Sequence, residues 1–347
     1  MKAITLHAPR DLRVETAPDP ELCDPRDAIV RVTRTAICGS DLHVYHGRET
    51  GLDAGTVMGH EFVGVVVEAG PAAGFAPGDA VVSPFTTSCA ACAPCRQGLT
   101  SRCEQGQLFG WVEGGRGLHG AQAEYVRVPL ADTTLMALPA DLSADEALLC
   151  GDVLATGFFC AQQGGARAGA TVVVLGCGPV GLMAVVGARE LGASAVQAVD
   201  ALPERLALAR GFGAEPLDLA AGNVAERVRA ASDGRGADVV LEAVGSPQAS
   251  RLAYDLVRPG GTIAAVGVHT EARFAFTPGE AYDKNLTYRA GRCPARRMME
   301  RVLPLAQERR HDLAAIVSHR LPLDEGPRGY ELFDRKLEGC TKVVLAP

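Results

Sequence analysis

Residues 36–61 carry side chains that could perform chemistry on a small molecule. Cys38 offers a thiolate, His60 an imidazole and Glu61 a carboxylate, and Ser40 and His43 lie between them in the sequence. A thiolate, an imidazole and a carboxylate are the ligand mix of catalytic zinc sites, which leave one position open for water or substrate. Alone, this spacing is weak support, because a buried structural cysteine near an ordinary polar histidine would look the same.

Four further cysteines have a spacing that fits one metal ion. Cys89, Cys92, Cys95 and Cys103 form a C-x2-C-x2-C-x7-C pattern with Ala, Pro and Gly between them. Four thiolates complete a tetrahedral zinc site and leave no open position, so this ion should be structural. The alternative is four unrelated free thiols.

A glycine-rich segment predicts a dinucleotide site. The apolar run 171–175 predicts a buried strand, residues 182–191 predict a helix, and the turn between them is Gly176-Cys-Gly178-Pro179-Val180-Gly181. This G-x-G-x-x-G pattern is informative because it stands between a strand and a helix. The glycines let the backbone approach a pyrophosphate, and the start of the helix supplies N–H donors.

The next predicted strand favours NAD over NADP. Residues 195–199 predict that strand, which ends in Asp200, 19 residues after Gly181. A carboxylate there accepts hydrogen bonds from the ribose hydroxyls and repels a 2′-phosphate. Arg205 is the nearest cation.

Composition predicts a globular protein that acts on small molecules. A chain of 347 residues suggests two domains, and a net charge of -7 provides no basic patch for nucleic acid. Residues 1–7 lack the apolar region of a signal peptide, and glycines and a proline interrupt the longest apolar run, 171–188. We therefore expect a cytoplasmic protein without a membrane segment, whose eleven cysteines bind metal rather than form disulfides.

The elements that must position these residues fall into two groups. The first 150 residues carry many short apolar segments bounded by Pro, Gly and Asp, which predicts a compact β-rich, barrel-like domain. From residue 171, strands alternate with helices, which predicts a parallel, doubly wound sheet. The predicted strands are 2–6, 28–35, 57–67, 64–69, 80–82, 121–128, 171–175, 195–199, 237–243, 262–266 and 340–345, and the predicted helices are 182–191, 204–211, 224–232, 247–256 and 292–307, with a turn at 258–261.

These motifs together resemble the zinc-containing alcohol dehydrogenases of the medium-chain dehydrogenase/reductase superfamily. The resemblance covers essentially the whole chain, including Gly339-x-x-x-x-Val344 near its end. It implies an α/β protein with a GroES-like catalytic domain at 1–152 and 289–347 and a Rossmann NAD-binding domain at 153–288.

The resemblance implies that Cys38 and His60 bind a catalytic zinc. The third ligand of such enzymes usually precedes a Thr-Gly pair, and counting back from Thr156-Gly157 places it on Asp152, with Cys150 in reserve. Glu61 would sit beside the zinc, either supporting its ligands or entering its shell during ligand exchange.

The resemblance also implies a proton relay. Ser40 would take the proton of the substrate alcohol and pass it, by way of the nicotinamide ribose, to His43 and then to solvent. An imidazole with a pKa near 6.5 suits this exit. The alternative is that His43 is an ordinary surface histidine.

Further site residues follow from the same resemblance. Phe85 and Leu108 match apolar residues of the substrate pocket, while Trp111 is either a core aromatic or a pocket residue. The predicted cofactor contacts outside the glycine loop are Thr156, Asp200, Arg205, Val244, Val266 and Lys342, where Lys342 would reach the pyrophosphate.

We therefore predict a zinc-dependent NAD(H) alcohol dehydrogenase acting on a small or medium alcohol. The alternatives are a threonine or polyol dehydrogenase, a glutathione-independent formaldehyde dehydrogenase, a zinc-free quinone or enoyl reductase, and a non-catalytic protein that kept the fold. Relatives are dimers or tetramers, so a homo-oligomer is expected, with residues 262–266 as a plausible edge strand.

Overall fold

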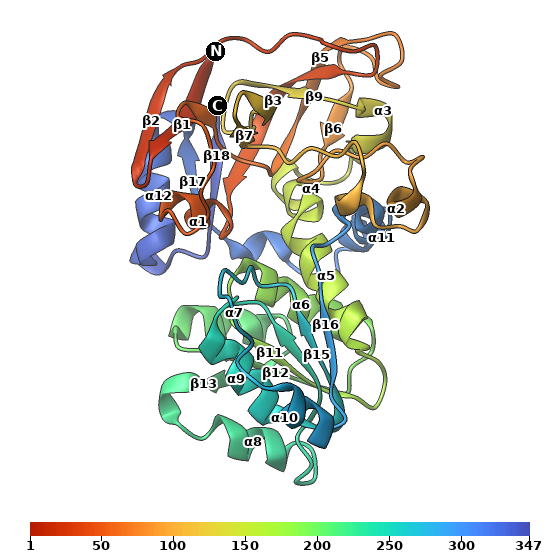
Figure 1. The fold of residues 1–347 in the computed structure, drawn as a ribbon, viewed down its shortest axis with the longest axis vertical. Helices are drawn as coiled ribbons and strands as arrows, with labels where there is room; N and C mark the ends of the chain where they lie inside the picture. The colour runs from red at the N-terminus through yellow and green to blue at the C-terminus, as the bar shows by residue number, and fades with distance from the viewer. The chain divides into compact units, whose positions relative to one another are not determined.

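The computed structural model describes residues 1–347, which form two compact units (Figure 1). One unit comprises Met1–Asp152 and Pro294–Pro347, and the other comprises Val153–Cys293. None of the helices combines the length and the apolar character needed to cross a membrane.

The second unit is built on a six-stranded sheet in the order β13-β12-β11-β14-β15-β16. All neighbouring strands run parallel, so their carboxyl ends share one edge of the sheet. The order changes direction at β11, the strand that precedes the glycine loop, and ligands of doubly wound sheets bind at such a point. The strands are β11 (Thr171–Leu175), β12 (Ala195–Asp200), β13 (Glu215–Asp218), β14 (Ala237–Glu242), β15 (Val257–Ala265) and β16 (Thr287–Ala290).

Helices on this sheet bury its apolar side chains. The helices are α5 (Val153–Gly164), α6 (Pro179–Glu190), α7 (Pro203–Gly211), η2 (Leu219–Ala221), α8 (Val224–Ala230), α9 (Pro247–Leu256) and α10 (Pro278–Asp283). Val173 and Leu175 of β11 pack with residues of α8 and α9 in one core cluster. Helices α5 and α6 pack against each other and against the central strands. The parallel sheet with its helices confirms the predicted Rossmann-type fold.

The first unit is rich in β-structure, as predicted. Its main sheet has the order β10-β6-β5-β3-β18-β17, with β9 also paired to β3, and a smaller sheet has the order β2-β1-β4. The strands are β1 (Lys2–Ala8), β2 (Asp11–Thr16), β3 (Ala28–Ile37), β4 (Thr56–Val57), β5 (Phe62–Ala69), β6 (Ala80–Val82), β7 (Trp111–Glu113), β8 (Arg116–Leu118), β9 (Tyr125–Val128), β10 (Met136–Ala137), β17 (Val317–Pro322) and β18 (Lys342–Ala346). Strand β18, from the end of the chain, lies between β3 and β17.

The first unit also contains helices, from single turns to a helix of 13 residues. They are α1 (Asp41–Tyr45), α2 (Ala93–Arg96), η1 (Thr100–Arg102), α3 (Ala131–Thr134), α4 (Ala144–Gly151), α11 (Ala295–Gln307), η3 (Leu313–Ile316), η4 (Leu323–Glu325), α12 (Gly326–Arg335) and η5 (Leu337–Gly339). A capping box between Ser143 and Glu146 fixes the start of α4, the helix that leads to Asp152.

Two sequence predictions about the sheet are wrong. Residues 262–266 were expected to be an edge, but β15 pairs with β14 on one side and β16 on the other. The predicted turn at 258–261 lies within the bounds of β15, where it forms a bulge, because the pairing with β14 passes directly from Val257 to Thr262. The edges of the sheet are β13 and β16.

Candidate metal centres and dinucleotide site

Four potential metal ligands from distant parts of the first unit converge in one buried cluster. Cys38 follows β3, His60 and Glu61 precede β5, and Asp152 follows α4. One ligand atom from each residue lies within 4.8 Å of all the others, and all four residues are buried. The structure thus brings together the three predicted zinc ligands and the acidic neighbour predicted beside them.

The contacts within this cluster place three ligand atoms and one hydroxyl around a common point. Asp152 Oδ2 lies 3.3 Å from His60 Nε2 and 3.5 Å from Cys38 Sγ. Ser40 Oγ lies 3.3 Å from the same His60 nitrogen. The hydroxyl predicted to take a substrate proton is therefore next to the candidate ligands.

Asp41 orients the histidine, a role that sequence reasoning missed. Its Oδ1 lies 3.2 Å from His60 Nδ1, which turns Nε2 toward Asp152, and its Oδ2 accepts a hydrogen bond from the Cys38 amide at 2.9 Å. A carboxylate on the second nitrogen of a histidine ligand is a common support in metal sites. Gln122 donates to Asp41 and accepts from the buried Tyr330 hydroxyl, so the support extends across the unit.

The electrostatics of the cluster suit a divalent cation. Burial lowers the pKa of His60, but Asp41 and Asp152 raise it by more, so the net pKa is well above its ordinary value. Burial also raises the pKa of the Cys38 thiol, as do Asp152 and Glu61. The carboxylates disfavour the Cys38 thiolate in this buried space unless a cation joins them, and a zinc ion would supply that positive charge, so the residues present fit a zinc ion.

Cys150, the reserve candidate for the third ligand, faces elsewhere. Its thiol hydrogen-bonds to the carbonyl oxygens of Glu146 and Val302, at 3.4 and 3.9 Å. It is fully buried, and burial raises its pKa. The structure therefore places Asp152, rather than Cys150, beside Cys38 and His60.

Lys342 lies in this centre, whereas the sequence prediction assigned it to the pyrophosphate. The Lys342 and Glu61 side chains have no exposed surface, and Lys342 Nζ lies 2.5 Å from Glu61 Oε1. Burial lowers the pKa of Lys342, but Glu61 and Cys38 raise it by more, so the ammonium keeps its charge. The other oxygen of Glu61, Oε2, has no hydrogen-bond partner. Lys342 thus anchors the carboxylate that borders the ligand cluster.

The remaining predicted residues of this unit have distinct surroundings. The Phe85 ring is buried and stands edge-on to His60, with 6.3 Å between ring centroids. Leu108 is partly buried and pairs through its backbone with Thr86, next to Phe85. Trp111 packs partly buried against a cluster of Leu6, Val44 and Met58, which fits the core alternative of the sequence analysis.

His43 lies on α1 and is half-buried, so it is more than a surface residue. Burial lowers its pKa, and its Nδ1 atom is buried without a hydrogen-bond partner. A neutral imidazole with one unused nitrogen can accept a proton.

The four predicted structural ligands also converge. The Sγ atoms of the four cysteines all lie within 4.8 Å of one another. Cys103 Sγ accepts a hydrogen bond from the Cys89 amide at 3.2 Å, and Cys89 Sγ accepts one from the Cys92 amide at 3.4 Å. Burial raises the pKa of Cys89, but backbone amides lower it by more, to about 6. Amide donors aimed at thiolates are what a four-sulfur metal site requires.

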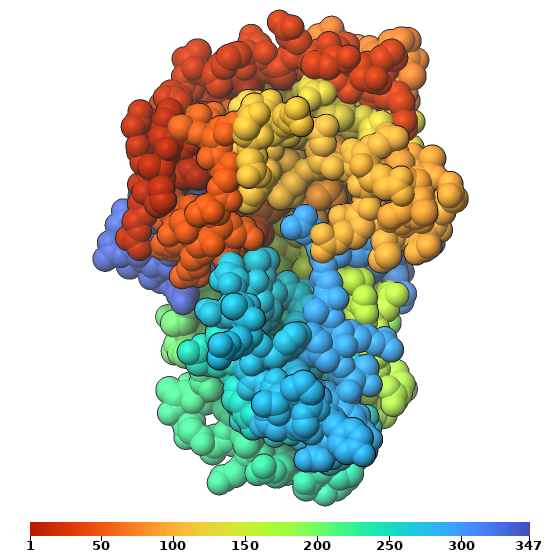
Figure 2. Space-filling model, in the orientation of Figure 1, coloured from red at the N-terminus to blue at the C-terminus, as the bar shows by residue number.

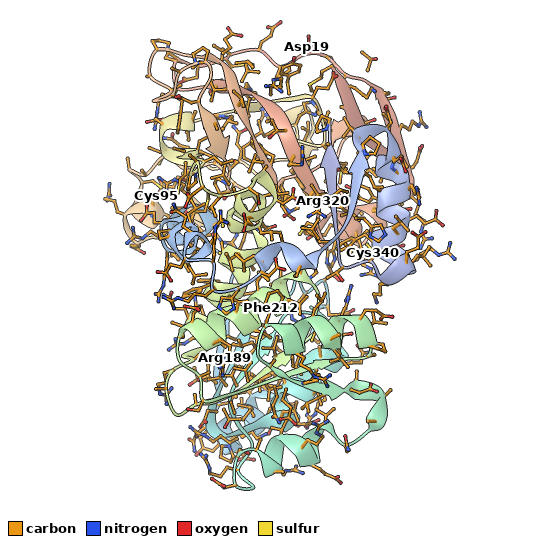
Figure 3. All side chains as sticks on the ribbon, turned by 180° about the vertical axis from the view of Figure 1, so that it is seen from behind. Asp19, Cys95, Arg189, Phe212, Arg320 and Cys340 are labelled. Carbon is orange, nitrogen blue, oxygen red and sulfur yellow. The ribbon has the colours of Figure 1, made fainter.

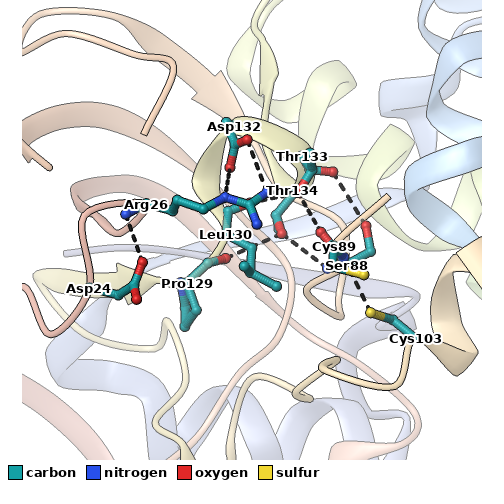
Figure 4. A network of polar contacts seen from close by, with 10 residues as sticks. All are labelled: Asp24, Arg26, Ser88, Cys89, Cys103, Pro129, Leu130, Asp132, Thr133 and Thr134. Atoms are coloured by element: carbon teal, nitrogen blue, oxygen red, sulfur yellow. Dashed lines mark hydrogen bonds and ion pairs between the residues drawn. The ribbon is translucent and has the colours of Figure 1, made fainter. Parts of the chain in front are cut away.

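The four cysteines and the residues between them form a lobe, and hydrogen bonds join this lobe to the rest of the first unit (Figure 4). The Thr133 hydroxyl on α3 donates to the Ser88 carbonyl at 2.6 Å, and the Ser88 amide donates to Thr134 Oγ1 at 3.1 Å. Arg26 pairs with Asp132 on the same helix, at 2.9 Å. In Figure 2 the segment that contains the four cysteines forms part of the surface. Figure 3 shows that Cys340 lies far from Cys95, so Cys340 does not belong to this cluster. All eleven cysteines are free thiols.

The glycine loop of the second unit has the geometry that a close phosphate contact needs. It connects β11 to α6, whose first residue is Pro179. A Cβ on Gly181 would lie 1.7 Å from the Gly176 carbonyl oxygen, so only glycine fits this turn. The 12-residue helix α6 then presents its N-terminus directly after the loop.

Asp200 is fixed at the end of β12 by backbone donors. Its Oδ2 accepts a hydrogen bond from the Cys177 amide at 2.7 Å, and its Oδ1 accepts bonds from the Ala201 and Leu202 amides at 2.8 and 3.0 Å. Arg205 approaches to 4.0 Å and lies beside Gly178. The carboxylate therefore belongs to the same loop system as the predicted phosphate site.

Of the other predicted cofactor residues of the second unit, two lie in loops after strands and one lies in a helix. Val244 follows β14 and Val266 follows β15, so both lie at the carboxyl ends of the strands, as the glycine loop does. Thr156 is buried on α5.

Comparison with known families matches both halves of this chain. The model of the alcohol dehydrogenase GroES-like domain matches residues 24–140, and the model of the zinc-binding dehydrogenase matches residues 179–308. A zinc-type alcohol dehydrogenase B from Aspergillus flavus is 43% identical over 345 residues, which cover 96% of this chain and 79% of that protein.

Solved structures agree with these matches. The alcohol dehydrogenase TADH from Thermus sp. ATN1 is 43% identical, with a TM-score of 0.93 over 100% of this chain and 99% of that one. A zinc-dependent alcohol dehydrogenase 2 from Streptococcus pneumonia is 31% identical, with a TM-score of 0.92 over 100% and 98% of the two chains.

Proposed function

The chain belongs to the zinc-containing alcohol dehydrogenases of the medium-chain dehydrogenase/reductase superfamily, and we propose that it interconverts a small or medium uncharged alcohol and its aldehyde or ketone with NAD(H). The observation that carries this proposal is the convergence of Cys38, His60 and Asp152 next to the Ser40 hydroxyl. The set contains three ligands, leaving room for a substrate oxygen.

The site offers residues for holding the metal and for moving the proton. Zinc held by Cys38, His60 and Asp152 would act as a Lewis acid that polarises the substrate oxygen. The Ser40 hydroxyl takes the proton that leaves this oxygen, and His43, neutral because burial lowers its pKa, carries the proton toward solvent. A bound NAD would supply the acceptor for the hydride of the alcohol carbon, so one hydride and one proton would be removed from the alcohol.

Asp200 supports NAD as the preferred dinucleotide. Three backbone amides hold its carboxylate in place, so it cannot turn away from a 2′-phosphate without losing them. Arg205 offsets part of this charge at 4.0 Å. We expect kcat/KM to be higher with NAD than with NADP, and Asp200→Ser to narrow the difference.

Phe85 supports an uncharged substrate. An aromatic ring that stands edge-on to a candidate zinc ligand makes that side of the centre apolar. This arrangement favours a simple alcohol over a polyol, threonine or hydrated formaldehyde, which remain the alternatives within the family.

We also propose a homodimer or homotetramer in the cytoplasm. Strand β16 is an open edge of the sheet, and exposed aromatic residues lie near it in the sequence: Phe274 is 68% and Tyr282 is 83% exposed. Open edges and exposed aromatic groups are features of protein interfaces. Eleven free cysteines suit a reducing compartment. Light scattering of the purified protein tests the oligomer.

The test of the reaction is NADH formation with primary alcohols, secondary alcohols, polyols, threonine and formaldehyde, before and after chelation. We expect turnover on a simple alcohol that a chelator abolishes and zinc restores. Cys38→Ala should be inactive, while Cys23→Ala, which removes an exposed cysteine outside both clusters, should behave as wild type. Turnover that survives removal of the metal would favour a zinc-free reductase, and bound zinc without hydride transfer would favour a non-catalytic protein.

A further inference from the structure

A buried carboxylate of the second unit has no part in the proposed reaction. Glu242 is the last residue of β14 and is 1% exposed. A carboxylate is costly to bury unless hydrogen bonds satisfy its oxygens. The partners of Glu242 therefore indicate what it is there to hold.

Glu242 binds two loops at once. Its Oε1 accepts hydrogen bonds from the Val244 and Gly245 amides, both at 2.8 Å, in the loop that follows β14. Its Oε2 lies 2.8 Å from Nε2 of His269, in the loop that follows β15. Its main-chain oxygen accepts two more bonds from this second loop, from the Val266 and Gly267 amides at 3.0 and 3.2 Å.

The two loops also touch backbone to backbone. A Cβ on Gly245 would lie 2.3 Å from the Val268 carbonyl oxygen, and a Cβ on Gly267 would lie 2.2 Å from the Gly245 nitrogen. Their contact therefore needs both glycines. Neither glycine has a side chain to interlock with the other loop, whereas the Glu242–His269 pair links the two loops through side chains.

Both loops lie where a dinucleotide is expected. They follow parallel strands at the carboxyl edge of the sheet, as the glycine loop does. Val244 and Val266, which were predicted to contact the cofactor, are held directly by Glu242.

We propose that Glu242 and His269 are positioning residues, whose pairing fixes these two loops in the shape that receives NAD(H). The inference rests on the proposed function, because it assigns the loops to that cofactor. The pair has no part in the proposed transfer of the hydride and the proton. Its loss should weaken cofactor binding far more than it slows catalysis at saturating cofactor.

The test measures the Kd for NADH by fluorescence, and KM for NAD and kcat by turnover. His269→Ala removes the link but leaves the two Oε1 bonds, and the side chain is only partly buried (27% exposed), so the variant should fold. We expect Kd and KM to rise about tenfold, the order expected for losing a hydrogen bond to a charged group, and kcat to change less than about twofold. His269→Gln, whose amide can donate to Oε2, should restore most of the affinity.

The chain offers a matched control in His7. Its Nε2 lies 2.8 Å from Glu15 Oε1, and its side chain is 24% exposed, but it belongs to the first unit. His7→Ala should leave Kd, KM and kcat unchanged. Amide hydrogen exchange of the cofactor-free protein should quicken in residues 266–269 for His269→Ala only.

The outcomes separate the two proposals. Wild-type protein that does not bind NADH would overturn the proposed function and the pair's role with it. Wild-type binding together with an unchanged Kd for His269→Ala would overturn the role of the pair alone, and faster exchange beside that unchanged Kd would show that the link is merely structural.

Discussion

Replacing Lys342 with methionine isolates one buried ion pair, whose effect the structure allows us to estimate. The Lys342 and Glu61 side chains are wholly enclosed, and Lys342 Nζ meets Glu61 Oε1 while Oε2 has no partner. Methionine fills much of the space of the lysine but leaves Glu61 as a buried carboxylate without its ammonium partner. Breaking a buried pair in this way costs about 3–5 kcal/mol.

This cost should appear as a large fall in thermal stability. For a unit of roughly 150–250 residues, each kcal/mol lowers the midpoint by about 2–4 °C, so Lys342→Met should lower the unfolding midpoint of the first unit by about 6–20 °C. Calorimetry measures it, with the zinc content of each variant determined in parallel. Lys2→Met serves as the control, because the Lys2–Asp324 pair is exposed and its loss should hardly move the midpoint.

The double variant Lys342→Met with Glu61→Leu decides whether the reasoning is right. Removing both charges removes the buried carboxylate as well, and apolar replacement of a buried pair is often neutral or stabilising. The double variant should therefore be more stable than Lys342→Met alone. A single variant within about 1 kcal/mol of wild type, or a double variant no better than the single, would refute the estimate.

Three more predictions test the metal sites and the second unit. Cys92→Ser should lower the zinc content by about one ion per chain and reduce the thermal midpoint, because metal binding supplies folding energy to such a lobe; elemental analysis and calorimetry measure both. Asp41→Asn should lower kcat/KM by about 10–100-fold, because it removes the carboxylate that orients His60, and a rate near wild type at full zinc content would contradict this role. Burial raises the pKa of Asp238, but the Thr171 amide and Arg258 lower it by more, so the pKa in the folded protein is below the ordinary value of 3.8. The ionised carboxylate therefore stabilises the folded protein at pH values above 3.8, and this stabilisation is lost as the pH falls through the pKa of the folded protein. The difference in thermal midpoint between wild type and Asp238→Asn should thus be largest near neutral pH and shrink in acid; a constant difference would be evidence against it.

Local sequence patterns predicted the parts of the fold that depend on near neighbours. Strand β11 and helix α9 have the bounds that apolar pattern, proline and glycine indicated, and the glycine loop stands between a strand and a helix as expected. Helices α4 and α12 were not predicted, although Ser143 and Glu146 carry the capping pattern that marks the start of α4. The place of β16 as the edge could not be read locally, because it depends on pairing between distant strands.

The site was predictable where one motif carries the chemistry and unpredictable where separate segments meet. The cysteine spacing and the Cys38–His60 resemblance directed attention to residues that the structure brings together. Asp41 lies close to these residues in the sequence, but its contact with His60 depends on how the chain folds to bring the start of β5 next to α1. Lys342 pairs with a residue 281 positions away, and no local pattern reports such a contact.

The separation of Lys342 and Glu61 along the chain determines how long after Glu61 its partner is synthesised. The first unit is discontinuous, and β18, which is synthesised after the whole second unit, is an interior strand of its sheet. At about 5–20 residues per second, Lys342 emerges roughly 15–55 s after Glu61. By the end of this interval the second unit has all of its residues, but until Lys342 emerges the first unit lacks the strand that joins β3 to β17. The ion pair of Lys342 with Glu61, beside the candidate zinc ligands, therefore forms only after the whole second unit has been synthesised.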